Sequence, residues 1–179
     1  HQDSLKIANN TISGGQGCTA ALTGIYASTG RNTTITISGN TITLTPNGAT
    51  PQLAGIVNNA GGFASTNIAE IFDNTIESCS YTTATSGAFR GIEQLAAAKI
   101  VRIYNNVVSN TTLSGTGAFH GLYVSANLGT ADSLLMHHNT ISDNSKIGSS
   151  GSFYGVQAGT ALIMFYLNTI RDNSVAAGT

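Results

Sequence analysis

Six side chains with the chemistry to bind a polar ligand recur beside glycines in this sequence of 179 residues. Three of them precede, and three lie within, the similar glycine-led segments GIEQ, GLYV and GVQA, so we expect them on neighbouring strands of one outer face. Aromatic rings pack against sugar faces while polar groups fix orientation, which makes a shallow carbohydrate-contact face one interpretation. The other interpretation is a surface ion pair beside strand tyrosines. The six residues are Arg90, Glu93, His120, Tyr123, Tyr154 and Gln157.

A catalytic set cannot be assembled from the acids and nucleophiles in this pattern. Glycoside hydrolysis by two carboxyl groups requires them within about 10 Å of each other, yet Glu93 is the only acid in the glycine-led segments. A Ser/His/Asp triad in register is not found either. We therefore predict no catalytic residue and no cofactor, and the sequence favours a protein that is not an enzyme.

We also expect no metal site. His137 and His138 are adjacent in a strand-like segment, where neighbouring side chains point to opposite sides. His120 has no obvious His or Cys partner in register. Cys18 and Cys79 fall two repeats apart, and two steps of about 4.8 Å are too long for a disulfide. Free, half-buried thiols are the prediction for both cysteines.

The element that positions these residues is a repeat with a period of about 32 residues. Six segments resemble one another, for example ITISGNTI at 35–42 and VRIYNNVV at 101–108. Apolar residues alternate within each segment at a spacing of two, which predicts strands. One asparagine recurs in every segment: Asn10, Asn40, Asn74, Asn106, Asn139 and Asn168.

These asparagines predict a tight corner between two strands of one coil. Such a corner needs a residue that tolerates left-handed backbone angles, and the residues before the asparagines are mostly turn formers, although Leu167 fits poorly. Asparagines stacked from coil to coil can hydrogen-bond their amides along the rod. The expected fold is one all-β domain over residues 1–179, a right-handed single-stranded parallel β-helix (solenoid) of about six coils with about three short strands each.

The unit resembles the parallel β-helix repeat of pectate-lyase-like proteins. The resemblance rests on segments such as ITISGNTI and VRIYNNVV, each followed by its glycine-led strand, and it covers nearly the whole chain. That superfamily includes polysaccharide lyases, polygalacturonases, phage tailspikes, adhesins and other surface proteins, so the resemblance implies a fold and leaves the activity open. A carbohydrate-active module is therefore the alternative to a structural protein.

Composition favours an exported protein without nucleic-acid or membrane partners. There are 7 Lys and Arg against 8 Asp and Glu, the net charge is −1, and no apolar run is long enough to span a bilayer. Few charges with abundant Asn and Thr favour an extracellular or cell-surface location. An outer face becomes apolar and aromatic towards the C-terminus, which predicts a partner surface: Phe72, Tyr104, Leu135, Met164 and Tyr166.

No capping element is recognisable at either end of the repeat array, although a solenoid normally needs caps over its terminal coils. We therefore expect either a slice of a longer surface protein or a unit that self-associates through its open coil ends. The first expected function is a structural or adhesive solenoid of the cell exterior, such as a fibre subunit. Glycan binding by the face around Arg90, Glu93, His120 and Tyr123 is the alternative.

Overall fold

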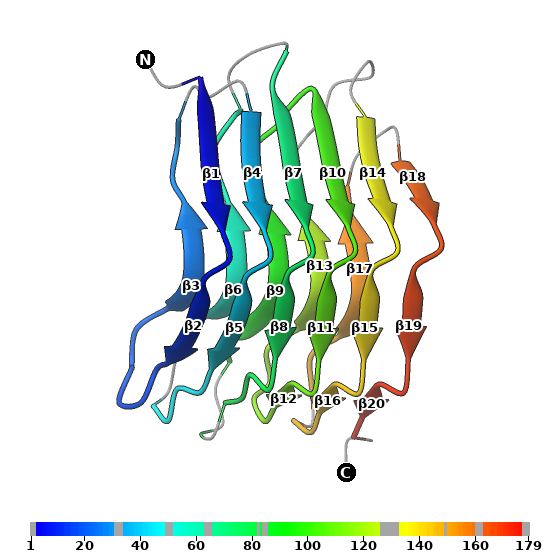
Figure 1. The fold of residues 1–179 in the computed structure, drawn as a ribbon. Coiled ribbons are helices and arrows are strands. Elements are labelled where there is room, and N and C mark those ends of the chain that lie inside the picture. The colour runs from blue at the N-terminus through cyan, green and yellow to red at the C-terminus, as the bar shows by residue number, and fades with distance from the viewer. Residues whose placement is uncertain are drawn as a thin grey trace.

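The computed structural model describes residues 3–30, 34–48, 52–62, 66–81, 83, 86–125, 133–148, 150–159 and 163–176. All regular elements of these residues are strands, which follow one another around a solenoid (Figure 1). Alternating apolar residues give each strand a buried side, and parallel stacking places these sides over one another from coil to coil. The predicted parallel β-solenoid with a spacing of about 32 residues is confirmed.

The first wall is a six-stranded parallel sheet made by the segments that precede the ladder asparagines. Its register follows the repeat, because Ile37 pairs with Ile71 and Ile71 pairs with Ile103. In order across the sheet, the strands are β1 (Ser4–Ala8), β4 (Thr34–Ser38), β7 (Ile68–Phe72), β10 (Ile100–Tyr104), β14 (Ser133–His137) and β18 (Ile163–Tyr166).

The second wall is also a six-stranded parallel sheet and lies just beyond the asparagine corner. It consists of β2 (Thr11–Gly14), β5 (Thr41–Leu44), β8 (Thr75–Glu77), β11 (Val107–Ser109), β15 (Thr140–Ser142) and β19 (Thr169–Arg171). The third wall holds the glycine-led strands, namely β3 (Leu22–Ala27), β6 (Gln52–Asn58), β9 (Ala88–Gln94), β13 (Phe119–Val124) and β17 (Phe153–Ala158). Because the third wall has five strands, the described residues complete about five turns rather than six.

The predicted asparagine ladder is confirmed at the first corner. Each side-chain Nδ2 donates to Oδ1 of the asparagine in the following coil, at 2.8 to 3.0 Å along the whole series. The left-handed residue is the one before the ladder asparagine, as at Asn105 (φ 55°) and Leu167 (φ 54°). The ladder asparagine itself keeps an ordinary backbone angle, so its role lies in its side chain.

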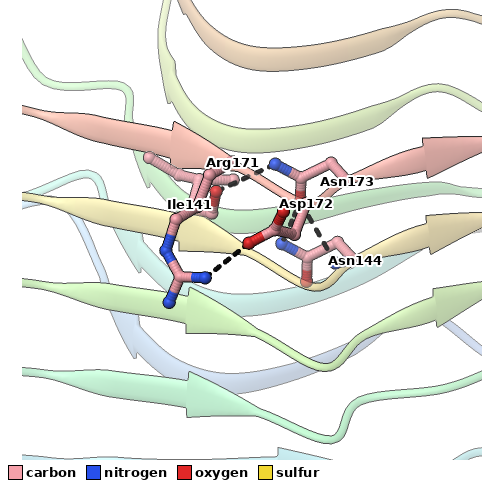
Figure 2. A network of polar contacts seen from close by, with 5 residues as sticks. All are labelled: Ile141, Asn144, Arg171, Asp172 and Asn173. Carbon is pink, nitrogen blue, oxygen red and sulfur yellow. Dashed lines mark hydrogen bonds and ion pairs between the residues drawn. The ribbon is translucent and has the colours of Figure 1, made fainter.

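A second corner follows in the later coils, and the sequence analysis did not predict it. Its residues with positive φ are Ser78, Asn110, Asp143 and Asp172. In the last two described coils an asparagine follows, and both the backbone N–H and Nδ2 of Asn144 donate to Oδ1 of Asn173, at 3.1 and 2.9 Å (Figure 2). Asn173 in turn donates to the carbonyl of Ile141, one coil earlier (Figure 2).

This second corner creates a short fourth sheet, so the later coils have four strands instead of the expected three. The strands are β12 (Thr112–Leu113), β16 (Ser145–Lys146) and β20 (Ser174–Val175). Lys146 points into the interior in register with Leu113. Its buried ammonium donates to the carbonyls of Gly115, Gly148 and Ser150. A buried cation is thus held by backbone dipoles rather than by a carboxylate.

The interior contains a column of stacked phenylalanines, which recur at the spacing of the repeat, and one of the two thiols. Phe119 stacks on Phe89 at 4.9 Å and on Phe153 at 4.5 Å between ring centroids. Both cysteines are free, but Cys79 lies fully buried at the second corner rather than half-buried in a loop. Burial raises the pKa of its thiol to about 11, which makes it unreactive at neutral pH.

Candidate binding site on the outer face of the third sheet

The six side chains that the sequence singled out for ligand binding lie together on the outer face of the third sheet. The register of β9, β13 and β17 skips each glycine, so the alternation of sides is interrupted there. The residue before the glycine and the second residue after it therefore face outward together. The two resulting columns are Arg90, His120 and Tyr154, and Glu93, Tyr123 and Gln157.

Glu93 is almost inaccessible, because only 2% of the residue is exposed. Its Oε1 forms an ion pair with Nη1 of Arg90, and its Oε2 accepts a hydrogen bond from Gln52 at 3.3 Å. Burial raises the pKa of this carboxyl, while Arg90 and Gln52 oppose the shift. The Arg90 guanidinium lies 4.6 Å from the centre of the Tyr123 ring. Glu93 therefore positions Arg90 and does not present a carboxylate to a ligand.

His120 is also largely buried, with 7% of the residue exposed. Its ring stacks on Tyr154 at 5.0 Å and meets Tyr123 at a tilt of 48°. Burial lowers its pKa and nearby Arg90 adds to this, whereas hydrogen bonds to Gln157 and to the Phe89 backbone raise it. Among the described residues, the buried atoms His120 Nδ1 and Arg90 Nε have no hydrogen-bond partner. The patch thus holds a neutral imidazole and one unused donor on a cation.

A hollow of about 330 Å³ lies beside this patch, over the first three coils. It exists because β6 carries the small residue Val57 between Tyr26 on one side and Glu93 on the other. The residue Tyr26 is 56% exposed, and the next coil places Val57 rather than an aromatic ring beside it. The residues that line the hollow are Ala21, Thr23, Tyr26, Gln52, Val57, Arg90, Glu93 and Leu95.

Tyr26, Gln52 and Thr23 were not among the predicted site residues. The signal that could have found them is the break in residue size along the outward columns, where Val57 interrupts a series of large side chains. The hollow offers an apolar floor, one open aromatic face and the polar groups of Arg90 and Gln52. Such a combination suits a small polyol ring. Arg90 and Glu93 belong to it, whereas His120, Tyr123, Tyr154 and Gln157 form a ridge beside it.

A comparison with protein-family models, curated proteins and solved structures finds no match for this chain.

The second predicted surface is a stacked aromatic ladder on the outer face of the first sheet. Tyr104 lies 4.8 Å from Phe72 and 5.1 Å from His137 between ring centroids, and His137 lies 4.9 Å from Tyr166. Each ring covers the face of its neighbour, so the ladder presents mostly ring edges to solvent. Leu135 and Met164 form the adjoining outward column.

The predicted orientation of His137 and His138 is wrong. His137 and His138 do not point to opposite sides, because their Nδ1 atoms lie 2.9 Å apart. The reason is the left-handed backbone of His138 (φ 56°), which turns the chain at the corner and brings its ring beside that of His137. The ring centroids are 5.1 Å apart and the ring planes are nearly perpendicular, at 87°.

Within the described ranges, no group of three or more His, Cys, Asp or Glu side chains is placed to hold a metal ion. Those same ranges contain no helix that is long and apolar enough to cross a membrane.

The first and last described coils leave apolar side chains uncovered. Ile163, Phe165 and Ile170 face the interior side of the last coil and are between 42% and 48% exposed. They border a cavity of about 550 Å³ with Met136 and Phe153. At the other end, Leu5, Ile7 and Ile12 are only partly buried against the core.

Proposed function

We propose that the chain is a structural rod of an exported surface protein, built as a right-handed parallel β-helix of the pectate-lyase-like type. The observation that carries the proposal is the uniform joining of the coils, since the same asparagine contact recurs at every step from Asn10 to Asn168. Each coil adds the same contacts to its neighbour, which is the property that lets a solenoid serve as a stiff spacer. The low charge of the chain supports a location outside the cell.

The aromatic ladder on the first sheet is the proposed partner or adhesive surface of this rod. It comprises Phe72, Tyr104, His137 and Tyr166, with Leu135 and Met164 beside it. Met164 and Tyr166 are among the exposed large hydrophobic residues, and clusters of this kind mark contact surfaces. Ring edges and aliphatic side chains fit a flat apolar surface of another protein better than they fit a sugar face.

A second candidate function is glycan binding in the hollow beside Tyr26. It is favoured by the open face of the Tyr26 ring opposite Arg90 and Glu93, at a size of about 330 Å³ that accommodates one sugar ring. The ridge of His120, Tyr123 and Tyr154 would border a longer glycan. We rank it second because the carboxylate of Glu93 is buried and the faces of Tyr123 and His120 are already occupied.

A glycan array and retention on insoluble polysaccharides, with the wild type and Tyr26→Ala, separate the two functions. The structural proposal expects no retention of either protein. Binding by the wild type that Tyr26→Ala abolishes, with unchanged thermal unfolding, would overturn it in favour of the second candidate. Location is tested separately with an antibody against the chain, which should label intact cells of the source. Labelling only after permeabilisation would contradict export.

A further inference from the structure

The asparagine ladder has a direction, and its two ends are complementary. Both the backbone N–H and Nδ2 of Asn139 donate to Oδ1 of Asn168, at 3.0 and 2.8 Å, and the same pair of bonds recurs at each earlier step. Asn168 in the last described coil therefore has a backbone N–H with no following Oδ1 to accept it. Among the described residues, Asn10 Oδ1 in the first coil correspondingly receives no donor.

Two further bonds accompany every step of this corner. The residue after the ladder asparagine donates its N–H to the carbonyl of the preceding ladder asparagine, as Thr169 does to Asn139 at 2.8 Å. In addition, the ladder Nδ2 donates to a carbonyl of the preceding coil, as from Asn168 to Met136 at 2.8 Å. The first described coil offers an unused donor at the Thr11 N–H, and Asn10 Nδ2, which donates to Asn40 and to the Ala8 carbonyl, has no carbonyl of a preceding coil beside it. The last coil offers the matching carbonyls at Asn168 and Phe165.

The apolar columns and strand directions match as well. Continuing the register of β14 and β18 by one step would set Ile163 on Leu5, Phe165 on Ile7 and Ile170 on Ile12 of a following coil. All these strands are parallel, so β18 of one copy and β1 of the next copy would run in the same direction. In the outward column Lys6 would meet Met164, so no like charges come together there.

We propose that the last coil of one copy of this chain docks in register on the first coil of a second copy, with Asn168 against Asn10 at the junction. The proposal rests on the structural function and names its partner. Such a contact joins two different surfaces of the same molecule, so it does not close and extends into a filament. A copy contributes six strands to the first wall, which at about 4.8 Å per strand predicts an axial repeat of about 29 Å.

Two end-blocked variants test this head-to-tail contact. Phe165→Arg places a charge in the seam of the last coil and leaves the first coil intact, whereas Ile7→Arg does the converse. The matched control is Thr169→Arg, which lies next to Ile170 of the same seam but points outward and would face Thr11 of the second copy. Mass is followed by light scattering and sedimentation over a concentration series, and the wild type is imaged by electron microscopy.

The wild type and Thr169→Arg should assemble into filaments, and each blocked variant alone should stay monomeric. An equimolar mixture of the two blocked variants should give 1:1 dimers, because each retains one intact end that is complementary to the other; dimer formation also shows that both are folded. A wild type that stays monomeric, blocked variants that assemble alone, or a mixture without dimers would overturn the contact. Those results would leave the structural rod standing, since the glycan and location experiments test that function separately.

Discussion

The carboxamide oxygen of Asn106 accepts two hydrogen bonds from Asn74, one from the backbone N–H at 3.1 Å and one from Nδ2 at 3.0 Å. The Asn106 Nδ2 meanwhile donates to Asn139 and to the carbonyl of Ile71. One side chain therefore satisfies polar groups in three successive coils. Since these groups are buried, a coil that slipped out of register would leave several of them without a partner.

Replacement of a central ladder residue should be strongly destabilising. Asn106→Ala removes the acceptor of both Asn74 donors and the donor to Ile71, all of them buried. We expect a loss of about 3 kcal/mol in the free energy of unfolding, because unsatisfied buried groups cost about 1 to 3 kcal/mol each. Urea denaturation followed by circular dichroism measures this loss. Asn10→Ala, at the exposed end of the ladder, is the control and should cost less than about 1 kcal/mol.

A substitution of Leu167 should make the folded protein more stable. It is 70% exposed and holds a left-handed backbone (φ 54°) that disfavours leucine. We expect Leu167→Asn to stabilise the protein by about 1 kcal/mol, since left-handed angles cost an ordinary residue about 1 to 2 kcal/mol and asparagine less. The reverse change Asn105→Leu, at an equivalent exposed corner (φ 55°), should destabilise by a similar amount. Opposite signs in thermal unfolding support this explanation, and equal signs refute it.

The glycine of the third wall should not tolerate a methyl group. A Cβ on Gly91 would lie 2.5 Å from the carbonyl oxygen of Gly121 and 2.7 Å from Cγ2 of Val108. We therefore expect Gly91→Ala to cost about 2 to 3 kcal/mol through overpacking. Gly159→Ala is the matched control, because a Cβ there meets nothing within 4 Å. If both variants melt at the wild-type temperature, the close approach of β9 and β13 is not as described.

His120 should make stability depend on pH. Burial lowers the pKa of its imidazole, so folding favours the neutral form. This contribution is fully present above the ordinary pKa near 6.5 and is lost as the pH falls through the lower folded value. Between about pH 7.5 and pH 5, His120→Phe should therefore lose less free energy of unfolding than the wild type does.

His137 is a second histidine that contributes to the pH dependence of stability. Its pKa is also lowered, first by burial and then by His138, so it acts in the same direction. Glu93 acts in the opposite direction, because burial raises its pKa and its contribution fades as the pH rises. The Glu93 contribution is common to the wild type and to His120→Phe. An unchanged pH dependence in His120→Phe would show that the imidazole is not buried as described.

The sequence predicted those features that repeat. The ladder asparagines, the phenylalanine column and the register of the walls all follow from residues that recur at one spacing. The outward grouping of Arg90 with Glu93, and of His120 with Tyr154, could be predicted for the same reason. Periodicity alone places a side chain on a face of a coil.

Features that depend on backbone angle or on local volume were missed. The second corner carries cysteine, threonine or asparagine at its buried position, so no single residue type marked it. His138 has a left-handed backbone angle, and simple alternation along a strand does not predict such a turn. The burial of Glu93 and the hollow beside Tyr26 arise from the sizes of neighbouring side chains such as Val57. Lys146 is buried at a position where periodicity gives leucine and valine.

Buried asparagine amides join each coil to the next, and native-state hydrogen exchange measures the strength of this connection. The backbone amides of Asn40, Asn74 and Asn106 each donate to the next Oδ1, at 3.1 Å. We predict that these amides exchange only through global unfolding, with the same free energy of opening as the most protected strand amides. Exchange of these amides at the rate of an unprotected peptide would contradict the ladder and the rod built on it.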